Sequence, residues 1–209
     1  MATFGLVHGA WHGGWAWDPL RAELEARGHS VVAPDLPCED PEAGLVEYAA
    51  VVRDALGGED GAIVVGHSLG GMTIPLVPAR LRVFLCALTP GASQENAFVP
   101  GFGDARVRDE LGRSYYPDAA DAARELQYPP DMASLASKLR RQARVDPVET
   151  PLRGAAAYVV CARDAAIGPD WQRHVARNVV GVEPIELQSG HSPMLTVPRE
   201  LADALESLV

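Results

Sequence analysis

Residues 63–72 read IVVGHSLGGM and place a single serine between glycines at the end of an apolar run. The letters IVV are typical of a buried strand. The five residues GHSLG match the pattern G-x-S-x-G, in which a serine occupies a tight turn between a strand and a helix. A side chain at Gly66 or Gly70 would collide with neighbouring backbone. The stretch therefore predicts a strained turn that exposes the Ser68 hydroxyl as a nucleophile; the alternative is a glycine turn without a chemical role.

Short apolar runs recur along the chain, with helix-like segments between them. Strand–helix alternation of this kind predicts an α/β fold, a mainly parallel six-stranded sheet covered by helices on both faces. A first helix is expected to begin with Asp18 as its cap and to end at Gly28. The other helical patterns cover residues 45–56, 69–79, 169–178 and 198–208, and the expected strands cover 3–8, 30–34, 62–65, 82–88, 156–161 and 182–187.

Residues 89–150 interrupt this alternation. They contain many prolines and no convincing strand, and a helix fits residues 131–145. An insertion this long between two core strands favours a cap over a functional site. We therefore expect a single domain, residues 1–209, with a cap or lid insertion at about 89–150. The insertion carries the aromatic residues Phe98, Phe102, Tyr115, Tyr116 and Tyr128.

The composition excludes several classes of partner. Among 209 residues, 47% are apolar and 22% are charged, and the net charge of −10 repels nucleic acids and anionic membranes. No apolar run is long enough to span a bilayer, and no signal peptide is visible at the start. Cys38, Cys86 and Cys161 are widely spaced, which favours buried free thiols. These features predict a cytoplasmic protein with neither a nucleic-acid nor a membrane partner.

A serine hydroxyl becomes a nucleophile only when a base removes its proton, and a carboxylate normally orients that base. His191, in the loop SGHSP at 189–193, follows the last expected strand and stands where a base is needed. Asp164, in CARDAAIG at 161–168, follows the strand before it and is the expected acid. Asp170 is the alternative, although it more readily caps the next helix. Asp35 lies on the wrong loop and is expected to be structural.

Acyl transfer also requires hydrogen-bond donors for the developing oxyanion. The backbone N–H of Leu69 is one candidate, and the N–H of Ala10, in VHGAWHGGW at 7–15, is the other. His8 is expected to brace this loop by bonding to backbone; a role in proton transfer is the alternative. His12 and His174 lack the partner spacing of a metal site. No metal and no cofactor are predicted.

Together, VHGAWHGGW, VGHSLGGM, the aromatic-rich insertion and GHSPMLTVP resemble one branch of the α/β-hydrolases, the plant methylesterase and hydroxynitrile lyase group with its bacterial esterase relatives. The resemblance runs through nearly the whole chain. It implies Ser68, Asp164 and His191 as a catalytic triad, with Ala10 and Leu69 as oxyanion donors. It implies no cofactor, and homodimers are common in the group.

Two positions distinguish the chemistries within that group. The resemblance implies that lyase members carry a lysine after the catalytic histidine and a threonine after the early histidine, where this chain has Ser192 and Gly9. We therefore expect a serine hydrolase that cleaves small hydrophobic or aromatic carboxylic esters through an acyl-enzyme. The alternatives are cyanohydrin cleavage of the hydroxynitrile lyase type, a slow-turnover ligand-binding protein on the same fold, and lactone or thioester cleavage.

Overall fold

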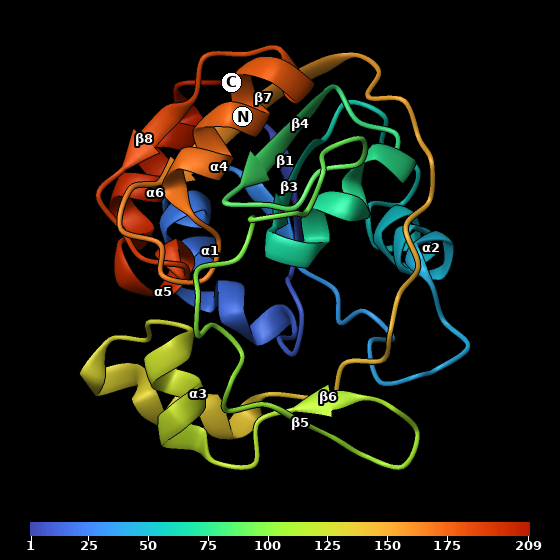
Figure 1. Ribbon diagram of the computed structural model, residues 1–209. Helices are drawn as coiled ribbons and strands as arrows, with labels where there is room; N and C mark the ends of the chain where they lie inside the picture. Colours follow the sequence, from blue (N-terminus) through green and yellow to red (C-terminus); the bar gives the residue numbers. More distant parts are fainter.

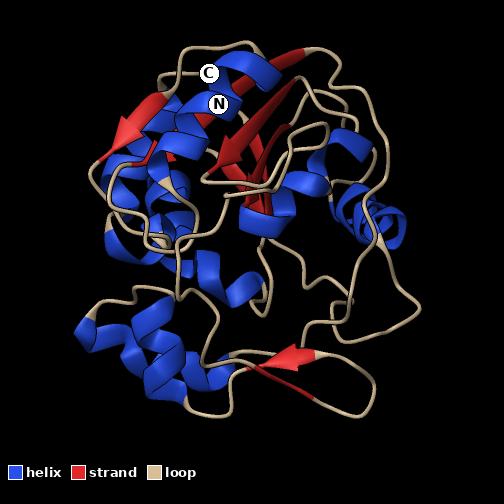
Figure 2. Ribbon diagram, in the orientation of Figure 1, coloured by secondary structure: helices blue, strands red, loops and turns tan.

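The computed structural model describes residues 1–209, and its centre is a six-stranded parallel sheet (Figures 1 and 2). The strand order is β2-β1-β3-β4-β7-β8, and every neighbouring pair is parallel. All six predicted strands and the predicted α/β architecture are confirmed. The strands are β1 (Thr3–Val7), β2 (Ser30–Val32), β3 (Ile63–His67), β4 (Leu81–Leu85), β7 (Ala155–Cys161) and β8 (Ile185–Leu187).

Helices cover both faces of the sheet, as the nearly continuous apolar strands require. On one face, Leu24 and Leu205 share a core with Phe4 of β1. On the other face, Val52 shares a second core with Val64 of β3. The first face carries η1 (Gly14–Trp17), α1 (Asp18–Ala26), α5 (Pro193–Thr196) and α6 (Pro198–Glu206), and the second carries α2 (Leu45–Ala55), α4 (Pro169–Val175) and the π-helical turn η5 (Ala176–Val180).

The segment after Ser68 is not the continuous helix predicted for residues 69–79. It forms two short 3-10 turns, η2 (Ser68–Met72) and η3 (Ile74–Leu76), and is extended again at Val77. Two consecutive glycines weaken an α-helix here, and Pro75 has no N–H to continue one. The serine is therefore followed by short 3-10 turns instead of a long helix.

Two predicted helix caps are wrong. Asp18 is the first residue of α1, Trp17 occupies the cap position, and the Asp18 side chain makes no capping bond. Asp170 likewise lies inside α4, which begins after Gly168. At the other end of α1, Gly28 has φ 84° and ends the helix as predicted, because glycine adopts this left-handed conformation without strain.

The insertion forms a separate layer beneath the carboxyl ends of the strands (Figure 1). Two predictions for it are wrong: it contains a short antiparallel strand pair, and its second helical segment stops at Lys138. Beyond that point the backbone N–H groups of Arg140 and Ala143 donate to Trp11 and Cys38 of the core, so they cannot continue a helix. The elements are β5 (Val107–Arg108), β6 (Ser114–Tyr115), α3 (Ala119–Glu125) and η4 (Pro130–Lys138).

The glycines around Ser68 lie where backbone segments meet. A Cβ on Gly66 would lie 2.7 Å from the Gly70 carbonyl oxygen, and a Cβ on Gly70 would lie 2.5 Å from that of Val7. Ser68 itself has φ 51°, a left-handed conformation that is strained for a serine. The predicted tight turn is therefore present, and glycine is required at both positions by lack of space.

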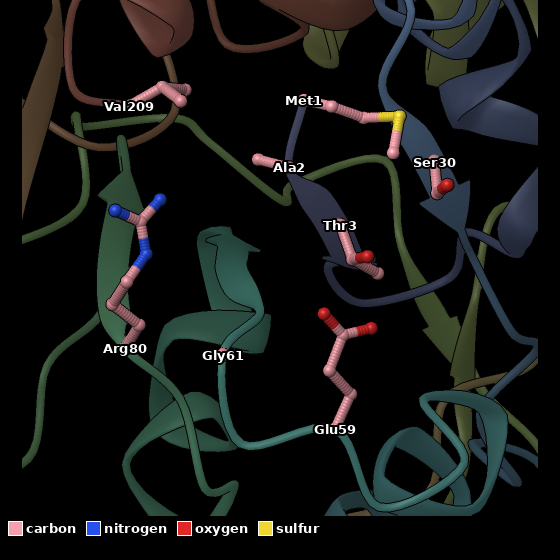
Figure 3. A pocket seen from close by; sticks show the side chains of 8 residues that line it. All are labelled: Met1, Ala2, Thr3, Ser30, Glu59, Gly61, Arg80 and Val209. Carbon is pink, nitrogen blue, oxygen red and sulfur yellow. The ribbon is translucent and has the colours of Figure 1, made fainter.

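A hollow of about 330 Å³ opens at the opposite, amino-terminal edge of the sheet (Figure 3). Both chain ends, Met1 and Val209, border it together with Glu59 and Arg80. It lies far from Ser68, because the strands separate the two edges. Nowhere does the structure contain a helix with the length and apolarity needed to cross a bilayer.

Gly70→Ala is expected to lower the free energy of unfolding by about 2–3 kcal/mol, because the new methyl group overlaps the Val7 carbonyl. Urea unfolding at neutral pH measures the change. Gly61→Ala is the control, since its nearest neighbour would be 3.8 Å away; we expect a change within about 0.5 kcal/mol. Equal effects of the two substitutions would contradict this explanation of the turn.

Candidate active site

Ser68 follows β3 directly and is partly exposed at the carboxyl edge of the sheet. Its carbonyl accepts a hydrogen bond from Leu88 N–H at 3.0 Å, which fixes the strained turn from one side. Gly9 packs against it from the other side: a Cβ on Gly9 would lie 2.8 Å from the Ser68 Cβ. These contacts fix the backbone and Cβ from which the Ser68 hydroxyl projects.

The structure brings His191 and Asp164 to this hydroxyl. The Nε2 atom of His191 lies 3.2 Å from Ser68 Oγ, and its Nδ1 lies 2.8 Å from Asp164 Oδ2. The imidazole and the carboxylate are both almost fully buried. His191 comes from the loop between β8 and α5, and Asp164 from the loop after β7. Three residues far apart in sequence therefore form one continuous hydrogen-bonded chain.

The carboxylate of Asp164 is fixed by three further donors. The N–H groups of Ala166 and Ile167 donate to Oδ1 at 2.7 and 3.0 Å, and Gln172 Nε2 donates to Oδ2 at 2.9 Å. Gln172 is fully buried in α4, and its role was not predicted because a single glutamine on a helix carries no distinctive sequence signal. Asp170, the alternative acid, instead pairs with Arg173 at the surface.

The early loop meets the serine at Gly9 and Ala10. The Ala10 N–H donates no hydrogen bond within the chain, so it is free to serve a ligand. The loop is held from outside: His8 Nε2 accepts from the Leu36 N–H at 3.0 Å, which agrees with the expected bracing role. The carboxylate of Asp35 accepts from Gly14 N–H at 2.7 Å, a structural contact as predicted.

Three buried histidines, His8, His12 and His67, are uncharged and hold the loops around Ser68 by hydrogen bonds. Burial lowers the pKa of His8 from 6.5 to about 4 and that of His12 to about 3, and it lowers the pKa of His67 well below 6.5. Their partners fit one tautomer each: His12 Nδ1 donates to the Ala10 carbonyl and its Nε2 accepts from the Tyr128 hydroxyl. His67 Nε2 donates to the His191 carbonyl at 2.7 Å.

The ligand atoms of His67, Cys86 and His191 lie within 4.8 Å of one another, which is the spacing of a possible metal site. Hydrogen bonds already involve all three residues, however, and among their nitrogens only His67 Nδ1 has no partner. The Cys86 thiol points at the His191 carbonyl, 3.5 Å away, and burial raises the pKa of this thiol well above its usual range. Both nitrogens of His191 have partners. The donor set thus suits a neutral hydrogen-bonded cluster better than a cation.

Phe102, Trp11 and Phe98 form an aromatic wall beside the imidazole of His191. The ring of Phe102 lies 6.1 Å from that of His191, and it contacts Trp11 and stacks on Phe98. The Arg106 guanidinium lies 4.8 Å from the Trp11 ring centre and 5.1 Å from that of Phe102. The insertion thus places an apolar surface next to the Ser68–His191 pair.

The fold is that of the α/β-hydrolases, and the chain belongs to the Alpha/beta hydrolase family, whose pattern matches residues 6–204. Among curated proteins, it is 30% identical to Salicylic acid-binding protein 2 from Nicotiana tabacum, covering 97% of this chain and 95% of that protein. It is 28% identical to Methylesterase 7 from Arabidopsis thaliana, covering 97% and 94%. A Carbendazim hydrolyzing esterase from Nocardioides sp. (strain SG-4G) is 40% identical over 50% of this chain and 46% of that protein.

Solved structures confirm the fold. The pyrethroid hydrolase PytH superposes with a TM-score of 0.82 at 25% identity, covering 100% of this chain and 97% of that one. Polyneuridine aldehyde esterase also gives a TM-score of 0.82, at 22% identity, covering 100% and 99%. The predicted resemblance to methylesterases and bacterial esterases is thus confirmed, and esterases are prominent among the relatives of this α/β-hydrolase.

Acidification is expected to destabilise the protein through its buried histidines. In the unfolded chain His8 and His12 take up protons below pH 6.5, whereas in the folded chain they stay neutral down to about pH 4 and 3. The unfolded state therefore binds more protons, and the free energy of unfolding falls as the pH falls through this window. Between pH 7.5 and 5.0 each imidazole contributes a loss of about 2 kcal/mol.

Urea unfolding at the two pH values measures this loss. His8→Gln, whose amide oxygen can still accept from the Leu36 N–H, should remove about 2 kcal/mol of the difference. His174→Gln, an exposed position, is the control and should leave the difference unchanged. A pH dependence that His8→Gln does not alter would show that the neutral imidazole of His8 is not the cause.

Proposed function

We propose that this protein is a serine carboxylesterase that cleaves small carboxylic esters through an acyl-enzyme. The observation that carries the proposal is the chain of contacts from Ser68 Oγ to His191 Nε2, 3.2 Å, and from His191 Nδ1 to Asp164 Oδ2, 2.8 Å. A hydroxyl, an imidazole and a buried carboxylate in this order can activate an oxygen nucleophile.

In the proposed acylation step, Ser68 Oγ attacks the ester carbonyl carbon while His191 Nε2 takes the hydroxyl proton. The N–H groups of Ala10 and Leu69 hold the oxyanion of the tetrahedral intermediate. Asp164 accepts from Nδ1 and stabilises the imidazolium that forms. The intermediate collapses when the C–O bond to the alcohol breaks, and His191 gives its proton to the departing oxygen.

Deacylation repeats these steps with water as the nucleophile. His191 Nε2 takes a proton from water, the hydroxide attacks the acyl carbon, and the same two N–H groups hold the oxyanion. The bond to Ser68 Oγ then breaks, the serine recovers its proton, and the carboxylic acid leaves. Each step is a proton or acyl transfer, so the residues on this chain suffice.

Two positions favour ester hydrolysis over cyanohydrin cleavage. The Ser192 hydroxyl is buried and donates to the Leu126 carbonyl at 2.7 Å, so it offers the site neither a charge nor a free donor. The Cβ of any side chain at position 9 would lie 2.8 Å from the Ser68 Cβ, which leaves no space for a threonine. The lyase remains the alternative for the experiment below.

We propose that residues 89–150 act as a cap that shapes the acyl site. Support comes from Phe102 beside His191 and from the bond between Trp11 Nε1 and Ser114 Oγ, which ties the insertion to the early loop. The aromatic wall suits a flat, hydrophobic acyl group. The names of relatives, which include methylesterases and a carbendazim-hydrolysing esterase, support small esters with short alcohols.

A cytoplasmic location is part of the same proposal. Cys38, Cys86 and Cys161 are free and buried, which suits a reducing compartment. Fractionation of the producing cells would test it, with the protein expected in the cytosolic fraction.

Ser68→Ala and His191→Ala are each expected to lower kcat for an aryl methyl ester by about 10⁴-fold or more, because both remove nucleophilic attack. Asp164→Asn should cost about 10³–10⁴-fold. Asp170→Asn is the matched control: it alters a surface ion pair and should keep kcat within about twofold. Steady-state hydrolysis assays measure all four variants.

The same assays separate the alternatives. The proposal expects multiple turnovers of an aryl ester and negligible release of cyanide from an aromatic cyanohydrin. Faster cyanohydrin cleavage would favour the lyase, and tight product binding without turnover would favour a ligand-binding protein. Full activity of Ser68→Ala would contradict every version of the mechanism.

A further inference from the structure

Three consecutive residues at the end of α3 each contact a different part of the site. The Leu126 carbonyl accepts from the Ser192 hydroxyl, next to His191, at 2.7 Å. The Tyr128 hydroxyl bonds to His12 Nε2 at 2.7 Å, and His12 in turn holds the Ala10 carbonyl. Between them, Gln127 reaches both loops that carry the imidazole and the carboxylate.

Gln127 makes three hydrogen bonds with its side-chain amide. Its Oε1 accepts from the N–H of His191 at 2.9 Å and from the N–H of Ala165 at 2.8 Å. Its Nε2 donates to the Arg163 carbonyl at 3.0 Å. One amide therefore joins the two residues that flank Asp164 to the backbone of His191.

The local backbone is shaped for these bonds. Gln127 has φ 55°, a left-handed conformation that is costly for a glutamine and that turns the chain after α3. On the opposite side, a Cβ on Gly190 would lie 2.7 Å from the Gln127 Cδ, so only glycine lets the amide approach the loop of His191. The strained backbone at Gln127 and the glycine at position 190 both allow the contact between the Gln127 amide and the loop of His191.

We propose that Gln127 is a positioning residue that sets the distance between the His191 imidazole and the Asp164 carboxylate, and thereby couples the insertion to the triad. The expected effect of Gln127 on kcat rests on the proposed esterase function, whereas its expected effect on the position of the His191 loop does not. The amide bonds only to the backbone of the two loops and acts through His191. Nothing else in the insertion bonds to both loops.

The rate of proton transfer from Ser68 depends sharply on the position of the His191 imidazole. The carboxylate has its own donors from Gln172 and from the turn after it, so its position survives the loss of Gln127. The backbone N–H of His191 has no other partner, so loss of Gln127 would leave this part of the loop held only through the His191 carbonyl and its neighbours, Ser189 and Ser192, and would permit a small shift of the imidazole. A displacement of a few tenths of an ångström in the base slows the chemical step, whereas substrate binding against the aromatic wall is unchanged.

Gln127→Gly tests the proposal with the least risk to folding, because glycine accepts φ 55° without strain. We expect kcat to fall about 10- to 100-fold with KM within about twofold. The acid limb of the kcat/KM profile should move to lower pH, because a displaced carboxylate stabilises the imidazolium less well. Gln127→Glu keeps the acceptor for both N–H groups and should restore kcat to within about fivefold of the wild type.

Gln142→Ala is the matched control. Gln142 is a buried amide of the same insertion, and its Nε2 donates to the Tyr48 hydroxyl and the Ala143 carbonyl, neither of which belongs to the loops of His191 and Asp164. Its loss should lower the melting temperature but leave the pH profile unmoved. If Gln142→Ala and Gln127→Gly changed kcat and the profile alike, the effect of Gln127 would be general destabilisation, and the positioning role would be overturned.

A readout independent of ester turnover separates this inference from the proposed function. The proton between His191 Nδ1 and Asp164 Oδ2 should give a downfield NMR resonance in the wild type, and Gln127→Gly should broaden it or shift it upfield. An unchanged resonance and unchanged kcat would overturn the positioning role, even if Ser68→Ala is inactive. A lost resonance in Gln127→Gly, together with full activity of Ser68→Ala, would overturn the esterase mechanism and leave the positioning role standing.

Discussion

Ser68 is held in the left-handed conformation, φ 51°, by backbone that closes in from several sides. Gly66 meets the backbone of Gly70, Gly70 meets Val7, and Gly9 meets the serine itself, each at a distance that excludes a side chain. These contacts fix the backbone of Ser68 at the carboxyl edge of the sheet. Because the turn at Ser68 is fixed, other contacts have to position His191 and the loop after β1 next to it.

The structure does this with buried, neutral hydrogen-bonding groups. His8, His12 and His67 hold the early loop and the His191 backbone, and burial keeps their imidazoles uncharged. Gln172 and the N–H groups after Asp164 hold the carboxylate. These groups form a shell of neutral donors and acceptors around the pair His191 and Asp164. Such a shell orients the pair without competing for its proton.

The sequence predicted what depends on local pattern. Apolar runs predicted the six strands, and the position of GHSLG between a strand and an expected helix indicated Ser68. His191 and Asp164 followed by their place after the last two strands. The errors lie where distant contacts decide the local structure. Residues beyond Lys138 are extended because their N–H groups bond to the core, and the amides of Gln127 and Gln172 acquire their roles only in the folded chain.

The central claim is that Ser68 forms a covalent acyl intermediate. Rapid mixing with a p-nitrophenyl ester, followed by acid quench and peptide mass mapping, tests it most directly. The account predicts a burst of about one equivalent of p-nitrophenol per chain and an acyl group on the peptide that contains Ser68. Steady turnover without a burst, with the acyl group absent from Ser68 or found on another residue, would contradict it.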